Sequence, residues 1–291
     1  GVIGKPLNID LIEENMDELV NNLSKQGHIG AREAIMTTDI IKKEIAVAIM
    51  YGDKKITIGG MAKGSGMIHP NMATTLGFIT TDANIDGVLL KEALKIAVDK
   101  SFNRVSVDGD TSTNDMVMIL ANGKAKNDRI NKKDEHYQVF LSALTYVCIE
   151  LAKLVAKDGE GCTKLIECYI NGALSEEHAV KLAKTVISSS LVKTAVFGAD
   201  ANWGRILCAL GYAGEEIDME KVDIIFESMK GYIEVCKNGN GLDFNEEKAK
   251  KILEDDEISI LVDLNMGNAR GNAWGCDLSY DYVRINGSYR N

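Results

Sequence analysis

Residues 63–81 read KGSGMIHPNMATTLGFITT, and the interpretation of the whole chain starts from this stretch. The run Gly64-Ser65-Gly66 is typical of a tight turn whose backbone N–H groups approach a ligand, because glycine has no Cβ and tolerates positive φ. Pro70 stiffens the segment that follows, and the apolar run at 76–79 predicts a strand. Between them stands Ala73-Thr74-Thr75. A threonine at the mouth of a strand, behind a rigid turn, is a candidate nucleophile.

This hypothesis needs a base, because threonine is a weak nucleophile at its ordinary pKa. One solution is the α-amine of Thr74 itself, freed when the chain is cut just before this residue. The simpler interpretation is structural, since a Thr-Thr pair commonly opens a strand and a glycine-rich turn is most often only a turn. The segment is not a Walker A loop, because Ser65-Gly66 stands where Lys-Ser/Thr is required. The local pattern alone favours the structural interpretation.

Hydrophobic periodicity predicts helices and strands that mix without internal repeats, and hence an α+β (layered α/β) fold. The expected helices lie at residues 11–25, 88–102, 134–156, 203–213 and 245–254. The expected strands are a hairpin at 44–60 around Gly52-Asp53, a strand–helix–strand unit at 165–198, and single or paired strands at 76–79, 117–121, 222–236, 258–264 and 273–285.

Composition excludes several classes of protein. The net charge of −10 disfavours nucleic acid as a partner, and 45% hydrophobic residues are enough for a full core. Uninterrupted apolar runs stay well below the ~20 residues that span a bilayer, which predicts no membrane partner. No signal peptide is recognisable, so the cytoplasm is the expected compartment. The cysteines form no C-x-x-C pair and are expected to be mostly buried thiols in a reducing compartment.

Two polar features are expected to be structural. Residues 107–115 (VDGDTSTND) lack the glycine and glutamate positions of an EF-hand, so we expect a hydrogen-bonded loop at the edge of the site. The four histidines lack paired spacing, which predicts no metal site. His69 is expected to be a turn residue ahead of Pro70.

The stretch 63–83 resembles the self-cleavage and nucleophile segment of the ornithine acetyltransferases, also called glutamate N-acetyltransferases, of arginine biosynthesis. Other blocks resemble further signatures of this family in the family's order, and a chance match of so many ordered blocks is very improbable. They are residues 34–39 (AIMTTD), 107–115, 158–167 (DGEGCTKLIE), 202–206 (NWGRI), 273–278 (AWGCDL) and 282–291 (YVRINGSYRN). Because the chain opens at Gly1 without Met, inside what resembles a Thr-Gly-Val-Ile-Gly block, we expect it to lack the family's N-terminal part.

The resemblance implies a fold of mixed β-sheets sandwiched by helices, in a self-processing enzyme with an N-terminal threonine. Residues 1–73 would be the C-terminal part of the α-chain region and 74–291 the β-chain region, with one shared core. Cleavage of Ala73-Thr74 would make Thr74 the new N-terminus and the nucleophile. Gly1 would be the second member of the oxyanion-hole Thr-Gly pair. The implied substrate contacts are Thr37, Lys63, Thr74, Glu160 and Asn286, with Asn291 where the family has a threonine.

The implied reaction moves the acetyl group from N²-acetylornithine to glutamate through an acetyl-threonine intermediate, with no cofactor. Whether acetyl-CoA is also a donor is left open by the resemblance; the lack of a CoA-type phosphate loop favours a monofunctional member. Two copies of each cleaved chain would form a heterotetramer. Two alternatives remain: an aminopeptidase or amidase of a related self-processing fold, in which water is the acceptor, and an inactive binding or subunit fragment without the N-terminal segment.

Overall fold

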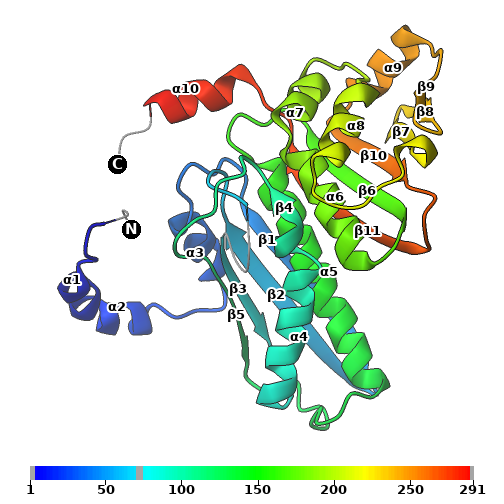
Figure 1. Ribbon diagram of the computed structural model, residues 1–291. Helices are drawn as coiled ribbons and strands as arrows, with labels where there is room; N and C mark the ends of the chain where they lie inside the picture. The colour runs from blue at the N-terminus through cyan, green and yellow to red at the C-terminus, as the bar shows by residue number, and fades with distance from the viewer. Residues whose placement is uncertain (1–3, 70–74, 289–291) are drawn as a thin grey trace.

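The computed structural model describes residues 4–69 and 75–288, which form two β-sheets covered by helices (Figure 1). The smaller sheet has the strand order β1-β2-β3-β5, and the larger one β4-β11-β6-β10-β7-β8-β9. Parallel and antiparallel pairs occur in both sheets. The predicted α+β fold with mixed sheets and covering helices is confirmed.

The smaller sheet begins with the predicted hairpin. Strands β1 (Lys43–Tyr51) and β2 (Lys54–Lys63) are antiparallel, and Gly52 in the turn has φ +59°. Strand β3 (Leu76–Thr81) pairs antiparallel with β2, and β5 (Met116–Ala121) pairs parallel with β3. Strands on both sides of the predicted cleavage point are therefore neighbours in one sheet. The division into 1–73 and 74–291 stays a prediction.

Helices α4 (Gly87–Asp99) and α5 (Glu135–Lys157) cover one face of this sheet. Buried and partly buried side chains alternate along β2, and this alternation explains which face of the sheet the helices cover. Ile56, Ile58 and Ala62 point toward the helices and are almost fully buried. A Cβ at Gly60 would lie 2.9 Å from Leu151 of α5, so only a glycine lets the helix approach this closely.

The larger sheet is built around β6 (Leu165–Ala173), which pairs parallel with β10 (Glu257–Asp263) and antiparallel with β11 (Ala269–Cys276). Helices pack against it, and their N-termini are capped by serine or asparagine side chains. The other elements are β4 (Val105–Ser106), β7 (Asp223–Ser228), β8 (Gly231–Lys237), β9 (Asn240–Gly241), α6 (Glu176–Ser188), α7 (Ser190–Phe197), α8 (Trp203–Gly211), α9 (Glu246–Leu253) and the 3₁₀ turns Phe102–Arg104 and Met219–Lys221.

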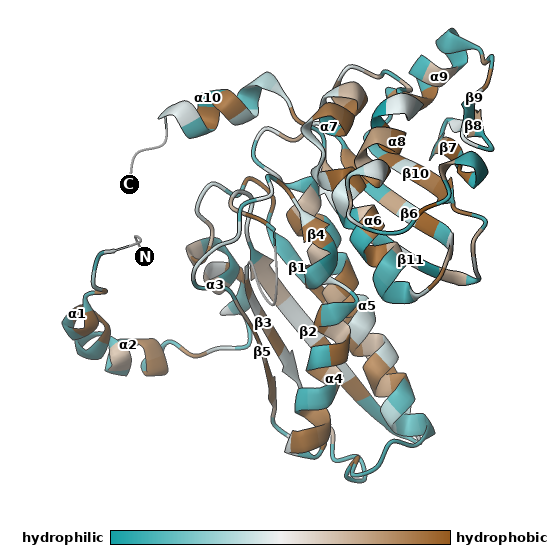
Figure 2. Ribbon diagram, in the orientation of Figure 1, coloured by the Kyte–Doolittle hydropathy of each residue, from teal (hydrophilic) through white to brown (hydrophobic). Residues whose placement is uncertain are grey.

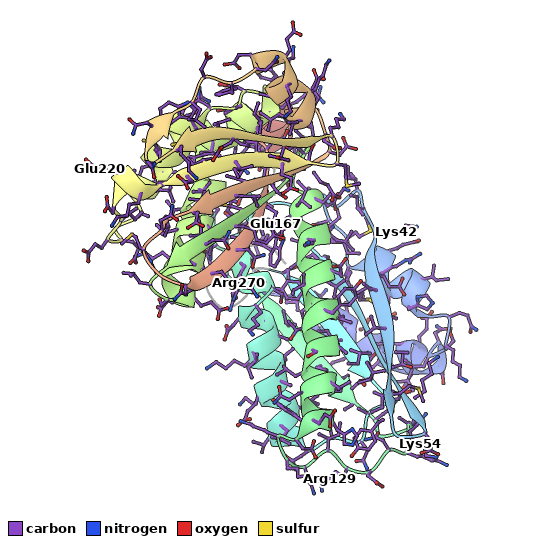
Figure 3. All side chains as sticks on the ribbon, turned by 90° about the vertical axis from the view of Figure 1, so that its right-hand side faces the viewer. Lys42, Lys54, Arg129, Glu167, Glu220 and Arg270 are labelled. Carbon is purple, nitrogen blue, oxygen red and sulfur yellow. The ribbon has the colours of Figure 1, made fainter. Side chains whose placement is uncertain are left out.

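Helix α5 joins the two sheets. Trp274 and Cys276 of β11 belong to the same hydrophobic cluster as the buried side of α5. Lys153 of α5 lies 3.3 Å from Glu167 of β6, and Figure 3 shows Glu167 where the helix meets the larger sheet. Among the described helices, α5 is the one that is long and apolar enough to cross a membrane by length and composition. Its apolar side is buried between the sheets, which accounts for that composition.

Three predicted elements differ from the structure. The expected helix at 11–25 is two short helices, α1 (Ile9–Glu14) and α2 (Met16–Asn21), because the chain leaves helical geometry at Asn15. Neither has a buried residue, and Figure 2 shows both helices, with hydrophobic positions among their residues, set apart from the two sheets.

The other two differences are strands that proved to be helices. The second strand expected in 165–198 is α7, whose first turn is capped by Ser189; its buried residues Val192, Ala195 and Val196 lie at helical spacing. The strand expected at 273–285 stops at Cys276, and α10 (Tyr280–Ser288) follows. Asp277 ends the strand by accepting the backbone N–H groups of Thr163 and Lys164.

Candidate active site

The structure describes four of the predicted site residues: Thr37, Lys63, Glu160 and Asn286. Gly1, Ala73, Thr74 and Asn291 lie outside the described residues. The four described positions come from segments far apart in the sequence. Two loops and helix α10 bring Thr37, Glu160 and Asn286 together around the Gly64-Ser65-Gly66 turn.

The turn follows β2 directly and is held from two sides. Gly64 has φ +146°, a conformation that favours glycine, as the sequence predicts. The Ser65 and Thr38 hydroxyls lie 2.6 Å apart, and the Ser65 carbonyl accepts the backbone N–H of Glu160 at 2.9 Å. The turn therefore joins the segment that contains Thr37 to the segment that contains Glu160.

The Glu160 carboxylate lies over Gly66. A Cβ at Gly66 would be 2.5 Å from the carboxyl carbon, so the absence of a side chain makes room for the carboxylate. One Glu160 oxygen accepts a hydrogen bond from the Asn286 amide at 2.7 Å. The predicted residues Glu160 and Asn286 are thus in direct contact, and Asn286 reaches Glu160 from helix α10.

A close approach of two backbones places α10. A Cβ at Gly161 would lie 2.5 Å from the Tyr282 nitrogen, and the Ser279 hydroxyl donates to the Gly161 carbonyl at 2.6 Å. Asn286 also donates to the Tyr282 carbonyl within the helix. The Gly161 turn therefore sets where α10 begins and how Asn286 faces Glu160.

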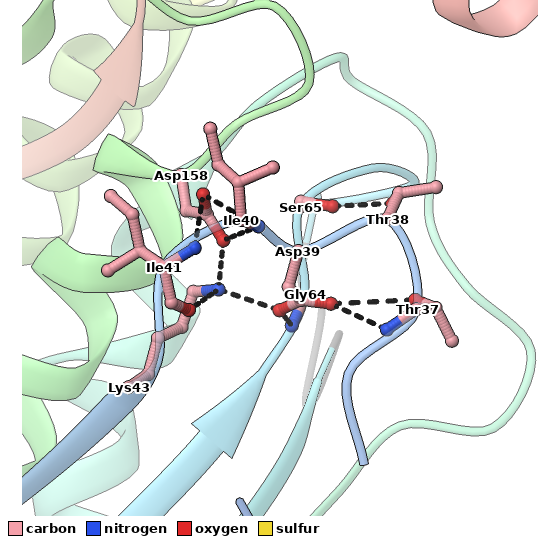
Figure 4. A network of polar contacts seen from close by, with 9 residues as sticks. All are labelled: Thr37, Thr38, Asp39, Ile40, Ile41, Lys43, Gly64, Ser65 and Asp158. Carbon is pink, nitrogen blue, oxygen red and sulfur yellow. Dashed lines mark hydrogen bonds and ion pairs between the residues drawn. The ribbon is translucent and has the colours of Figure 1, made fainter. Parts of the chain in front are cut away.

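A buried ion network supports the turn and both loops (Figure 4). The Lys43 ammonium contacts Asp39 at 2.6 Å and also Asp158, and all three side chains are fully buried. Asp39 accepts the Gly64 N–H at 2.7 Å and the Thr37 N–H at 3.1 Å. Asp158 accepts the N–H groups of Ile40 and Ile41 and lies two residues before Glu160. The network fixes Thr37, Gly64 and the start of the Glu160 turn relative to one another.

The network also sets the protonation of Asp39. Burial raises the pKa of Asp39, but the hydrogen bonds from Gly64, Lys43 and Thr37 outweigh burial and hold the pKa below its usual value. A lowered folded-state pKa means that this carboxylate stabilises the fold at neutral pH. That contribution is lost as the pH falls through the folded-state pKa.

Sequence reasoning missed the network. Asp39 and Asp158 lie in blocks that carry the family resemblance, at residues 34–39 and 158–167. Lys43 had no signal, because it stands in the first position of a strand among other lysines. A pairing between Lys43 and a carboxylate 115 residues away is invisible without the fold.

Lys63 and Thr75 border the segment that contains the predicted nucleophile. Lys63 is the last residue of β2, is half-buried and stands opposite Leu76 in the sheet register. No direct bond joins it to Glu160 or Asn286 in the part of the chain that the structure describes. Thr75 is buried, and its hydroxyl lies 3.0 Å from the position of a Cβ on Gly64. The residue that follows Thr74 in sequence is therefore packed against the turn.

The predicted loop at 107–115 is hydrogen-bonded to the lead-in segment. Asp108 accepts the N–H groups of Met67 and Ile68, and the Thr111 hydroxyl donates to the His69 carbonyl at 2.8 Å. The His69 ring lies 2.9 Å from the Ser106 hydroxyl. Burial, with Lys184 nearby, lowers the pKa of His69 and favours its neutral form.

This loop also reaches α10. The Tyr282 hydroxyl lies 3.4 Å from Asp108. Burial and the neighbouring Asp108 raise the pKa of Tyr282 to about 12, so its hydroxyl stays protonated and can donate this bond. The loop is thus a structural support at the edge of the site.

The side chains on either side of the turn carry opposite charges. The Glu160 carboxylate suits a positively charged or hydrogen-bond-donating nitrogen, while the Lys63 ammonium suits an anion. Asn286 and Thr37 offer neutral hydrogen bonds.

Comparisons with known proteins all point to one family. A model of the ArgJ family matches residues 1–291. The arginine biosynthesis bifunctional protein ArgJ 1 of Clostridium acetobutylicum is 56% identical over 290 residues, which are 100% of this chain and 71% of that protein. The arginine biosynthesis bifunctional protein ArgJ of Caldanaerobacter subterraneus is 50% identical, with 100% and 72% covered. This chain therefore spans about 71% of the length of such relatives.

A solved structure of a protein with the same name is also similar to this chain. The crystal structure of the arginine biosynthesis bifunctional protein argJ from Bacillus halodurans superposes with a TM-score of 0.71 at 49% sequence identity. The match covers 74% of this chain and 100% of the solved chain.

The first prediction concerns the ion network. Replacing Lys43 with Met leaves two buried carboxylates without their counter-ion, so the free energy of unfolding should fall by about 3–5 kcal/mol. Urea denaturation measures this change. The matched control is Lys42→Met, which removes an exposed pair with Glu33 and should cost at most about 1 kcal/mol. Equal losses in the two variants would contradict a central role for Lys43.

Proposed function

This chain belongs to the ArgJ family, as its sequence blocks predict, and we propose that it transfers the acetyl group of N²-acetylornithine to glutamate. The names of the relatives confirm the prediction of an enzyme of arginine biosynthesis. One observation supports the specific reaction best: the Glu160 carboxylate lies over the Gly64-Ser65-Gly66 turn and contacts Asn286. That turn precedes the proposed nucleophile, Thr74, by eight residues in the sequence.

In the proposed mechanism, the Thr74 hydroxyl attacks the acetamide carbonyl while the Thr74 α-amine takes its proton. Backbone donors, with Gly1 among them, stabilise the tetrahedral oxyanion, and one such donor is worth roughly 2.7–4 kcal/mol. Ornithine leaves and an acetyl ester remains on Thr74. The glutamate amine then attacks the ester and carries the acetyl group away.

The two substrates share an α-carbon with a carboxylate and an amine, but their side chains end in opposite charges. One site must accept both in turn, so its fixed charges should read the shared end. We assign Lys63 to the shared carboxylate and Glu160 to the amine that bears the acetyl group. Thr37 and Asn286 are neutral and tolerate either side chain. We propose Asn291 as a further substrate contact, at the position where the family that the sequence resembles has a threonine.

We propose that the chain cleaves itself between Ala73 and Thr74, by attack of the Thr74 hydroxyl on the Ala73 carbonyl and hydrolysis of the resulting ester. Two observations support this proposal. The match to the solved relative covers the full length of that chain and 74% of this one. Residues 74–291 are about three quarters of this chain. Strands β2 and β3 pair across the proposed cleavage point, so the two products would stay together.

The proposed active form has two α and two β chains in the cytoplasm. The word bifunctional in the names of the relatives favours a second acetyl donor, against the monofunctional member that the missing phosphate loop favours, and we propose acetyl-CoA as that donor. An aminopeptidase or amidase would transfer the acyl group to water instead. Incubation of N²-acetylornithine with and without glutamate distinguishes these reactions, because hydrolysis at an equal rate in both would favour the amidase. An inactive fragment would release no ornithine in either tube.

The second prediction concerns cleavage. Wild-type protein should give two pieces, 1–73 and 74–291, on denaturing electrophoresis and by intact mass. Thr74→Ala should stay as one chain and show no acetyl transfer, because both the nucleophile and its α-amine are lost. Thr75→Ala is the matched control and should still cleave. A wild-type chain that is active while intact would contradict the α-amine mechanism.

The third prediction concerns Lys63. If Lys63 binds the shared carboxylate, Lys63→Ala should weaken both half-reactions by similar factors, worth about 2–5 kcal/mol in transition-state binding. Single-turnover assays of each half-reaction measure the two factors. Lys55→Ala, at an exposed position near the other end of β2, should leave both rates unchanged. Loss in the glutamate half alone would show that Lys63 binds the side chain.

The fourth prediction concerns Gly66. A Cβ at this position would collide with the Glu160 carboxyl group, which is the far end of a flexible side chain and can move away. Gly66→Ala should therefore raise KM by about tenfold while changing the free energy of unfolding by less than about 1 kcal/mol.

The matched control is Gly59→Ala, where the new Cβ would meet its nearest neighbour at an ordinary 3.7 Å. This variant should keep the wild-type KM. An unchanged KM in Gly66→Ala would exclude Glu160 from substrate binding. Unfolding of Gly66→Ala, but not of Gly59→Ala, would show that the contact between Gly66 and Glu160 contributes to the stability of the fold.

A further inference from the structure

The segment of residues 105–116 holds the chain on both sides of the proposed cleavage point. Before that point, Asp108 accepts the backbone N–H groups of Met67 at 2.7 Å and Ile68 at 2.9 Å, one on each carboxylate oxygen. The Val107 N–H donates to the Ile68 carbonyl at 2.7 Å. Three hydrogen bonds from one short stretch of chain therefore fix the backbone at residues 67 and 68.

Further hydrogen bonds reach His69 and Thr75. The Thr111 hydroxyl donates to the His69 carbonyl at 2.8 Å, and the His69 ring lies 2.9 Å from the Ser106 hydroxyl. After the cleavage point, the Met116 N–H donates to the carbonyl of the buried Thr75 at 2.8 Å. The same segment thus fixes the chain at residue 69 and again at residue 75, with residues 70–74 between them.

Met67 has an unusual backbone conformation. Its φ is +56°, in the left-handed region that is unfavourable for a residue with a Cβ. Such a conformation persists only where the surrounding structure holds it. The Met67 side chain is 41% exposed, so packing contributes little, and the hydrogen bond to Asp108 is the contact that fixes this residue. Because a change of φ turns all of the chain that follows, Met67 sets the direction in which the backbone continues to His69.

The carboxylate of Asp108 suits this task. Besides the two N–H groups before the cleavage point, it accepts the Asp110 N–H at 3.2 Å, and the Tyr282 hydroxyl lies 3.4 Å from it. Hydrogen bonds to an ionised acceptor are shorter and roughly twice as strong as neutral ones. An asparagine would accept with only one of its two terminal atoms. Asp108 therefore holds Met67 and Ile68 in a way that its amide analogue reproduces only in part.

We propose that Asp108 is a positioning residue for self-cleavage. By fixing residues 67–69, while Met116 fixes Thr75, it restricts the geometry in which the two ends of the 70–74 segment are presented. This inference rests on the proposed cleavage at Ala73-Thr74 and adds a residue outside that segment that sets its rate.

The role of Asp108 is geometric, because the reacting groups belong to Ala73 and Thr74. In the cleavage step, the Thr74 oxygen bonds to the Ala73 carbonyl carbon, the C–N bond between the two residues breaks, and the hydroxyl proton passes to the released amine nitrogen. Water then hydrolyses the ester to a carboxylic acid on Ala73 and the free hydroxyl of Thr74. Such an attack needs the reacting atoms roughly 3–3.5 Å apart and aligned, and a misplacement of about 1 Å can cost about a hundredfold in rate.

The test follows cleavage of the full chain, made by cell-free synthesis so that the uncleaved form is seen first. Denaturing electrophoresis at successive times gives the rate constant for conversion into 1–73 and 74–291. Asp108→Ala should slow this conversion by about a hundredfold. Asp108→Asn should slow it less, because one acceptor oxygen remains. Asp110→Ala makes the same change of charge at an exposed position of the same loop and should cleave at the wild-type rate.

A second substitution tests the path through Met67. Glycine adopts positive φ without steric cost, so Met67→Gly should restore part of the cleavage rate that Asp108→Ala loses. A residue that only stabilised the fold would show no such rescue. If the double variant cleaved as slowly as Asp108→Ala, Asp108 would not act through Met67, and the proposal would be wrong.

Hydrogen exchange shows whether the variants keep the fold. It is measured in Thr74→Ala, which is expected to stay intact. Adding Asp108→Ala should speed exchange of the Met67 and Ile68 amides by at least about tenfold and leave β2 protected as before. Cleavage of Asp108→Ala at the wild-type rate would overturn this inference alone. A wild-type chain that never cleaves would overturn the cleavage proposal itself, so the two failures are distinguishable.

Discussion

The buried contact of Lys43 with Asp39 and Asp158 is the interaction on which the rest of the site depends. Burying three charges is costly, and they are stable here because each carboxylate also accepts backbone N–H groups. Those accepted groups belong to the segments that form the site. The same electrostatic requirement that stabilises the ions therefore fixes the Gly64 turn and the start of the Glu160 turn in one geometry.

Glycines decide how closely the segments approach once the ions hold them. Gly66 leaves room for a carboxylate, Gly161 leaves room for the start of α10, and Gly60 lets α5 pack on the sheet. At each place a methyl group would lie within 2.9 Å of another group. Close backbone contacts of this kind, which hydrophobic patterning does not encode, therefore shape the site around the Gly64 turn.

The sequence predicts local features well and long-range ones poorly. The 44–60 hairpin and helix α5 were predictable, because turn residues and a 3.6-residue period act within one segment. Helix α7 was missed although its cap is local, because its β-branched residues alternate as in a strand. Helix α10 was missed because the end of β11 at Asp277 depends on Thr163, in another segment. Glu160 and Asn286 followed from family resemblance, whereas Lys43 needed the fold.

The two sides of the site differ in how firmly they are held. The network side, with Thr37 and the Gly64 turn, is tied to fully buried ions, whereas α10 has no buried residue and is held by its contacts with Gly161, Glu160 and Asp108. In the proposed reaction the constant end of the substrates needs a rigid partner and the variable end needs an adaptable one. Asn286, on the less constrained helix, meets the second requirement.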